Sequence, residues 1–237
     1  MRVLITHLTR MSYPRVCVAG LDEDGRYIRP VVGRHEILNL EAVDKGLLEL
    51  GNWIDLGGHE FRPQPPEVED CYFELANARL VGKASPKEFW FYLKRSAKKS
   101  LDAIFGEKLD VRETSLGTTL ALPAGVGKAS LGDFLVEELD LVIRLHEYKG
   151  ELKLRGVFAV GGLKLSVAVT DLRFYNWSKG AFRLDTQKVQ EVRKKLGETR
   201  VILSLGLSRA KGFGNSPETW HWLQINGVHL ESEPLWK

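Results

Sequence analysis

The sequence predicts a mainly β protein in which two β-rich parts flank a helical segment. Most of the chain alternates apolar and polar residues in steps of two, which is typical of half-buried strands. The strand-like runs are concentrated at the two ends of the chain, and only two segments show the three- and four-residue spacing of an amphipathic helix. We therefore expect an N-terminal β module at 1–82, a helical insertion and linker at 83–131, and a C-terminal β module at 132–237.

The N-terminal part contains several short strand-like runs separated by turn residues. The Asp22-Glu23-Asp24-Gly25 sequence is a turn signal between two of them. Pro63, Pro65 and Pro66 mark a loop, because proline cannot donate a hydrogen bond inside a sheet. We expect strands at residues 3–6, 16–20, 26–32, 52–56 and 72–80.

The clearest helix signal begins at Ser85. Ser85-Pro86-Lys87-Glu88 combines a capping box with proline at the first helical position. The apolar spacing continues to Phe105, where Gly106 can end the helix, and lysine and arginine occupy the opposite face. The stretch 106–130 is expected to be loop-like.

The C-terminal part shows the most regular alternation in the chain. Residues 139–145, 151–155 and 163–169 predict three consecutive antiparallel strands, joined by turns at Gly150 and at Gly161-Gly162. A short helix is expected at 186–196, and further strands at 201–207 and 220–225. Asn226-Gly227 predicts a tight hairpin turn, because this dipeptide accepts positive φ at both positions.

The composition excludes a disordered, collagen-like or low-complexity protein. The chain is 43% hydrophobic and 27% charged, which is typical of a folded globular protein. Its 34 Lys and Arg against 31 Asp and Glu leave a net charge of +3, so a polyanion partner requires local gathering of positive charge. Residues 36–79 hold ten of the acids and only three of the cations, so the charge is segregated. No run of about 18 apolar residues predicts a membrane span, and we expect a cytoplasmic protein.

Arginine and aromatic residues are interleaved in three places, a combination that suits single-stranded nucleic acid. Cations bind the phosphates and exposed rings stack on the bases. The alternative is that the rings belong to the core and the arginines to ion pairs or solvated faces, and the sequence leaves both open. The candidate nucleic-acid-binding residues are Arg10, Tyr13, Arg15, Tyr27, Arg29, Arg173, Tyr175, Trp177, Arg209, Lys211 and Phe213.

Motifs for catalysis or metal binding are mostly missing. Residues 122–130 resemble a phosphate loop, but Leu122 replaces its first glycine and Ala129 its magnesium-binding hydroxyl residue. Two cysteines and six scattered histidines lack the spacing of a zinc site. We therefore expect no cofactor and no metal, and a binding protein rather than an enzyme. One alternative is a metal-dependent nuclease that uses Asp140, Glu151 and Lys153; another is a protein-interaction adaptor.

Short stretches along most of the chain resemble a known family. The matching N-terminal runs are 4–10 (LITHLTR), 15–22 (RVCVAGLD) and 25–31 (GRYIRPV), and the C-terminal ones are 169–174, 202–209 and 222–228. They resemble the dual OB-containing domain family, although Tyr27 stands where that family usually has tryptophan. The resemblance implies two OB-like β-barrels and a nucleic-acid- or nucleotide-binding role in prokaryotic defence-type systems. We expect single-stranded DNA or RNA, or a nucleotide, as the ligand, with a protein partner as a further possibility and no membrane.

The two ends of the chain also resemble each other. Residues 2–10 are similar to 200–209 if one residue is inserted, and each run ends in a hydroxyl residue followed by arginine. The likeness indicates either a duplication or the general similarity of apolar strands.

Overall fold

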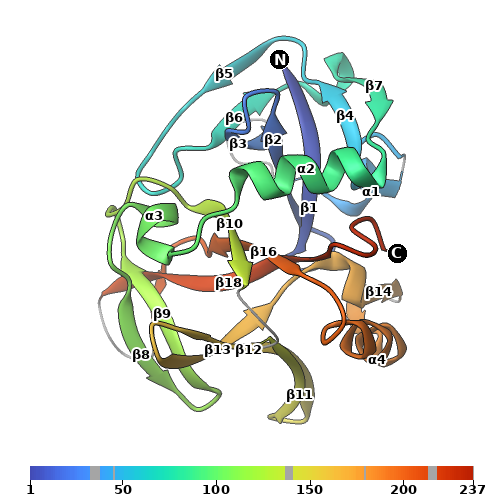
Figure 1. Ribbon diagram of the computed structural model, residues 1–237. Helices are drawn as coiled ribbons and strands as arrows, with labels where there is room; N and C mark the ends of the chain where they lie inside the picture. The colour runs from blue at the N-terminus through green and yellow to red at the C-terminus, as the bar shows by residue number, and fades with distance from the viewer. Residues whose placement is uncertain (33–37, 45, 137–140, 179, 213–217, 237) are drawn as a thin grey trace.

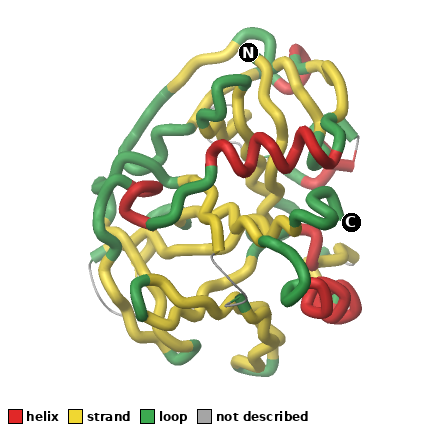
Figure 2. Tube along the Cα trace, in the orientation of Figure 1, coloured by secondary structure: helices red, strands yellow, loops and turns green. Residues whose placement is uncertain are grey.

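Two curled β-sheets form the protein, one from each end of the chain (Figure 1). This is a computed structural model, and it describes residues 1–32, 38–44, 46–136, 141–178, 180–212 and 218–236. Strands make up most of the trace, and helices are few and short (Figure 2). The prediction of a mainly β fold is therefore confirmed, and the two curled sheets are consistent with two OB-like modules.

The first strand of the chain lies inside the N-terminal sheet, with a neighbour on each side. Its order is β5-β6-β3-β2-β1-β4-β7, with β1 hydrogen-bonded to β2 and β4. A shift of register between Ile5 and His7 bends β1, and nearly the whole strand is buried. The strands are β1 (Arg2–Arg10), β2 (Val16–Asp22), β3 (Tyr27–Val32), β4 (Asn52–Asp55), β5 (His59–Phe61), β6 (Asp70–Phe73) and β7 (Arg79–Lys83), with the short helix α1 (Leu40–Asp44) between β3 and β4.

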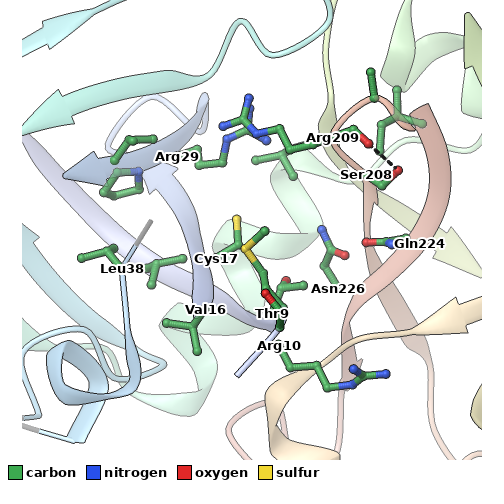
Figure 3. Close-up of a pocket in the computed structure, with 18 of the residues that line it drawn as sticks. Thr9, Arg10, Val16, Cys17, Arg29, Leu38, Ser208, Arg209, Gln224 and Asn226 are labelled. Atoms are coloured by element: carbon green, nitrogen blue, oxygen red, sulfur yellow. Dashed lines mark hydrogen bonds between the residues drawn. The ribbon is translucent and has the colours of Figure 1, made fainter. Parts of the chain in front are cut away.

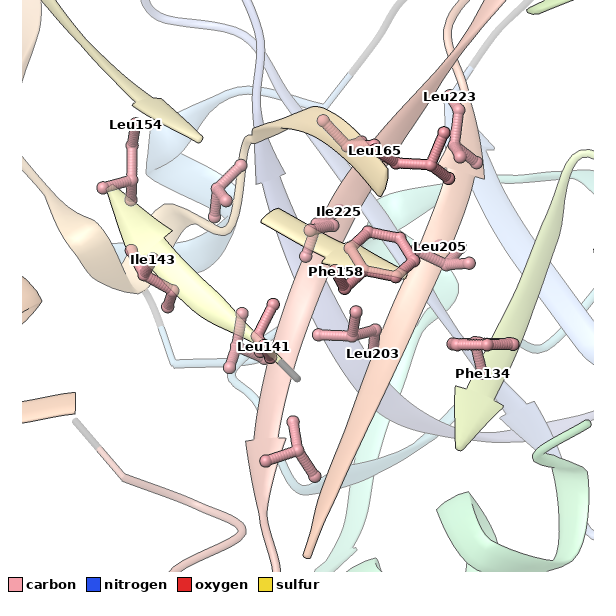
Figure 4. Close-up of a cluster of buried hydrophobic side chains, with 14 of the residues drawn as sticks. Phe134, Leu141, Ile143, Leu154, Phe158, Leu165, Leu203, Leu205, Leu223 and Ile225 are labelled. Carbon is pink, nitrogen blue, oxygen red and sulfur yellow. The ribbon is translucent and has the colours of Figure 1, made fainter. Parts of the chain in front are cut away.

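The C-terminal sheet contains the predicted meander, which is confirmed for the described residues. Strands β11 (Val142–Tyr148), β12 (Glu151–Val160) and β13 (Leu163–Val169) pair antiparallel in sequence order. The sheet continues through β18 (Thr219–Leu230) and β16 (Val201–Leu207) to β10 (Leu131–Val136). Between its strands and the α4 helix (Thr186–Lys195) lies the larger core, in which Phe158 packs among leucine and isoleucine side chains (Figure 4).

The predicted hairpin turn at Asn226-Gly227 is wrong. Strand β18 runs straight through both residues, and Gly227 pairs with Ser204 of β16. Glycine is needed there because a Cβ would lie 2.6 Å from the His229 ring, and not because the backbone turns. The register of the two strands shifts beside this pair, between Ser204 and Leu205.

The stretch 106–130 is also more ordered than the sequence predicts. It forms the hairpin of β8 (Asp110–Thr114) and β9 (Gly117–Pro123), and β9 pairs with the start of β18. The Arg112 guanidinium lies over the Trp220 ring, with 3.6 Å between its central carbon and the ring centroid. The segment thereby extends the C-terminal sheet.

The central helix is divided into two. The Ser85 hydroxyl caps α2 (Pro86–Ser96) as predicted, by accepting a hydrogen bond from the Glu88 amide. The backbone then becomes extended, and Lys98 bonds to β10 through the Asp133 carbonyl before α3 (Leu101–Phe105) begins. Helix α2 crosses the front of the junction between the two sheets (Figure 1) and packs Phe89 and Leu93 against apolar residues of β1 and β16. No helix among the described residues is long and apolar enough to cross a membrane.

Candidate functional site

A cavity of about 350 Å³ lies between the two sheets. The end of β1, the start of β2 and part of β3 form one side of it, and the end of β16 and the middle of β18 form the other. Apolar side chains and four cations line it, and none of the described lining residues is an acid or an aromatic residue. The four cations are Arg10, Arg29, Arg209 and Lys211, all of which the sequence singled out.

Two of these arginines share one buried carboxylate. Arg29 is only 5% exposed, and its Nε donates to Asp70 Oδ1. The Arg209 Nη2 donates to the other oxygen of Asp70 over 3.0 Å, and its Nη1 lies 3.3 Å from a Glu67 oxygen. Figure 3 shows the two arginine side chains side by side at the cavity. Asp70 therefore holds two guanidinium groups in fixed positions without itself lining the cavity.

Several buried polar atoms in the cavity wall have no hydrogen-bond partner among the described residues. They are the Nη2 of Arg29, the Nε of Arg10 and the Oγ1 of Thr9. The other terminal nitrogen of Arg29 is engaged, since it donates to the Ser130 hydroxyl over 3.1 Å. A buried donor without an acceptor costs about 1–3 kcal/mol. An anionic or hydrogen-bonding ligand in this cavity would remove that cost.

Arg10 links the cavity to a group of aromatic side chains. Its guanidinium lies over the Tyr175 ring, 4.3 Å from the centroid, and the Tyr175 hydroxyl donates to the Val169 carbonyl. Tyr175 begins the hairpin of β14 (Tyr175–Ser178) and β15 (Ala181–Leu184), in which Trp177 stands opposite Phe182. Tyr13 meets Phe182 edge to face. We call Tyr13, Trp177 and Phe182 the aromatic face; Tyr13 and Trp177 are each 41% exposed.

The structure brings most of the predicted binding residues together, but not all. Arg15 is exposed in the loop between β1 and β2 and does not line the cavity, although Ser12 before it and Val16 after it do. Tyr27 lies elsewhere, with its ring 5.9 Å from that of His7 and its hydroxyl buried. Arg173 holds Asp171, the Val228 carbonyl and the Trp236 ring, so it ties down the C-terminal segment instead of facing the cavity. Phe213 lies outside the described residues.

Glu151 and Lys153, the described residues of the nuclease alternative, do not line the cavity. Glu151 and Lys153 form an ion pair with each other near the exposed start of β12. Asp140 lies outside the described residues. Across the part of the chain that the structure describes, no group of three His, Cys, Asp or Glu residues is placed to hold a metal ion.

The sequence reasoning missed the neutral residues of the cavity and the carboxylate behind it. Thr9, Cys17, Gln224 and Asn226 line the cavity, and Asp70 orients its arginines. The resemblance between the two chain ends was the available signal, because Thr9-Arg10 and Ser208-Arg209 meet at the same cavity.

A separate buried polar cluster lies between strands of the C-terminal sheet and does not line the cavity. Ser204 contacts both Asp133 Oδ1, over 2.8 Å, and His229 Nε2, over 3.0 Å. Burial, helped by the charges of Arg29 and Arg173, lowers the pKa of His7 to about 3, and burial lowers the pKa of His229 well below its usual value. Burial also raises the pKa of Asp133 to about 6.

The buried, neutral state of His7 and His229 predicts that these two groups destabilise the fold as the pH falls below the pKa of free histidine. Between pH about 4 and 6 the unfolded chain protonates both histidines while the folded chain does not. Asp133 and Glu69, whose pKa values burial raises, act in the opposite direction, so the contribution of a histidine is isolated by substitution. We expect His7→Asn to reduce the pH slope of the free energy of unfolding by about 1.4 kcal/mol per pH unit in this range, as measured by urea denaturation. An unchanged slope would contradict the buried, neutral state of His7.

Comparison with known proteins gives little further information. No family model matches the chain, and no curated protein matches it. Among solved structures, a murine DNA-binding protein bound to double-stranded DNA is similar over 95% of this chain and 91% of its own, at 9% sequence identity and a TM-score of 0.30. A likeness at that level carries no argument about fold or function, so the functional case depends on the site itself.

Proposed function

We propose that this chain binds single-stranded nucleic acid at the cavity between its two β modules and along the adjoining aromatic face. The observation that carries the proposal is the convergence of Arg10, Arg29, Arg209 and Lys211 on one cavity whose described lining contains no acid. The chain acts as a binding protein, and the family that it resembles supports a place in a prokaryotic defence-type system.

Electrostatics support a phosphate-bearing ligand. Asp70 and Glu67, which do not line the cavity, offset part of the positive charge. The Nη2 of Arg29 and the Nε of Arg10, which have no partner among the described residues, belong to side chains that line it. Arginine matches phosphate well, because its planar guanidinium can donate two parallel hydrogen bonds. The local charge also explains how a chain with a net charge of only +3 could bind a polyanion.

The aromatic face supports single strands over duplex. Tyr13 and Trp177 offer exposed rings beside the Arg10 side of the cavity. Stacking on such rings contributes about 1–3 kcal/mol per base and requires bases that are not already stacked in a duplex. A strand could therefore place its backbone on the cations and neighbouring bases on these rings.

Fluorescence polarisation with short labelled DNA and RNA strands, and with the matching duplexes, tests the proposal. We expect single strands to bind more tightly than duplexes, and the logarithm of the affinity to fall with the logarithm of salt concentration with a slope of about −2 to −3, since each neutralised phosphate of a single strand contributes about −0.7. Absence of salt-sensitive binding to every strand would contradict the proposal and favour the adaptor alternative, which a pull-down would then examine. Cleavage that requires Mg²⁺ and is lost in Glu151→Ala would favour the nuclease.

A further inference from the structure

We propose that the cavity accommodates a single nucleoside monophosphate unit, with its base in the apolar interior and its phosphate at Arg209 and Lys211. The inference rests on the proposed function and goes beyond it, because it assigns one nucleotide of the ligand to the cavity. It concerns the cavity alone; the aromatic face would receive the neighbouring nucleotides of a strand.

The volume of the cavity limits the size of the ligand that it can hold. Its volume of about 350 Å³ lies at the lower end of the range of about 300–1,000 Å³ that small-molecule pockets occupy. One nucleotide is a ligand of that scale, whereas a run of stacked nucleotides or a duplex is far larger. Only one unit of a strand can therefore enter, and the rest must lie outside.

The chemistry of the walls divides the cavity into two regions. Val16 and Leu38 form an apolar wall on the N-terminal side, and Leu207 and Leu131 add apolar surface on the other. Figure 3 shows Val16 and Leu38 on one side of Cys17, with the amides of Gln224 and Asn226 across from them on β18. A flat apolar group with polar edges suits such a space, and asparagine and glutamine amides are the side chains that pair with base edges.

The buried donors limit the chemistry of the ligand, because they require acceptors. Arg29 is nine-tenths or more buried, yet its Nη2 lacks a partner in the described structure; the same holds for the Oγ1 of Thr9. Both line the cavity, so a ligand must carry acceptors deep inside as well as a charge at the rim. A nucleobase or sugar supplies such acceptors, and a phosphate supplies the charge that Arg209, 48% exposed, and the exposed Lys211 would meet. A simple inorganic anion would leave the apolar wall unused.

The same nucleoside monophosphate chemistry can come from a strand or from a free nucleotide, and Cys17 offers a probe that distinguishes them. Cys17 lines the cavity, whereas Cys71, the other cysteine, is fully buried and serves as the internal control. The experiment measures the rate at which iodoacetamide alkylates each cysteine, by mass spectrometry of the full chain. It is run at alkaline pH, because burial raises the pKa of the Cys17 thiol. The ligands are adenosine, guanosine, cytidine and uridine 5′-monophosphates, inorganic phosphate, and a short single strand.

We expect Cys17 alone to react in the free protein, and the strand and at least one nucleoside monophosphate to slow that reaction by about tenfold, which corresponds to occupancy of about 90% of the sites. Inorganic phosphate should protect much less. A strand that binds by fluorescence polarisation but leaves Cys17 equally reactive would overturn this inference while the proposed function stands. Protection by free nucleotides without any strand binding would keep the cavity assignment and overturn the proposed function. A Cys17 that does not react in the free protein would show that the cavity is closed, which also overturns the inference.

A cavity-filling variant provides a second, independent test. Cys17→Leu adds volume inside the cavity without removing a charge, so we expect strand affinity to fall about tenfold while the salt slope stays that of the natural protein. The matched control is Cys71→Ala, which removes the other thiol from a residue that does not itself line the cavity. Undiminished affinity in a folded Cys17→Leu protein would contradict entry of a nucleotide into the cavity.

Discussion

Replacing Arg29 with methionine is expected to lower the free energy of unfolding by about 3–5 kcal/mol, because it leaves the buried Asp70 carboxylate without its closest partner. Both side chains are less than a tenth exposed, and the pair joins β3 to β6. Arg29 also donates to Ser130, 101 positions away in the sequence, so its loss removes a link from β3 to the residue that precedes β10. Arg209 remains as a partner for Asp70, which places the expected value toward the lower end.

Urea denaturation of Arg29→Met and of Arg26→Met measures this effect against a matched control. Arg26 is three positions away and pairs with Asp22 and Asp24, but its side chain is 74% exposed, so we expect little change in stability from its loss. Adding Asp70→Asn to Arg29→Met should recover part of the lost stability, because it removes the unpaired charge. Equal effects of Arg29→Met and Arg26→Met would show that the buried ion pair does not stabilise the fold.

Replacing Arg10 and Arg209 together with alanine is expected to weaken binding of single strands at least about 100-fold, since hydrogen bonds to charged groups contribute about 1.5–3 kcal/mol each. Arg10 is the last residue of β1 and Arg209 follows the end of β16 by two residues, on the opposite side of the cavity. The salt slope should also become shallower by about 1.4, or about 0.7 for each lost phosphate contact.

The control for this double variant is Arg193→Ala together with Arg144→Ala. It removes the same charge from exposed positions on α4 and β11, neither of which lines the cavity. Fluorescence polarisation should give the natural affinity and slope for the control. Equal losses in the two double variants would show that binding follows net charge alone and does not use the cavity.

The parts of the fold that the sequence predicts are those set by local pattern. Strands β11, β12 and β13 follow from alternation, and the start of α2 follows from the Ser85 cap. Gly227 was misread because a glycine required for close packing against His229 looks the same in sequence as a glycine required for a turn. The break after α2 arises from backbone bonds between Lys98 and β10, which no local pattern reports.

For the site as well, the sequence predicts which residue types take part and does not predict where the fold places them. The sequence identified Arg10, Arg29 and Arg209 by their type and their interleaving with aromatics, but their convergence depends on pairings between distant strands. Arg173 has the same local pattern as Arg10, yet it faces Asp171 and the C-terminal segment. Which arginine faces a cavity is decided by tertiary contacts, and the sequence pattern does not contain them.

Hydrogen–deuterium exchange in the presence of a bound single strand tests the central claim most directly, because it reports where the ligand lies. We expect slower backbone exchange in the segments 9–18 and 207–212, which contribute lining residues to the two sides of the cavity. We expect the same in β14 (175–178), which carries Trp177 of the aromatic face. Protection confined to the cationic end of α2, around Lys94 and Arg95, would contradict the account and place nucleic acid on the outside of the helix.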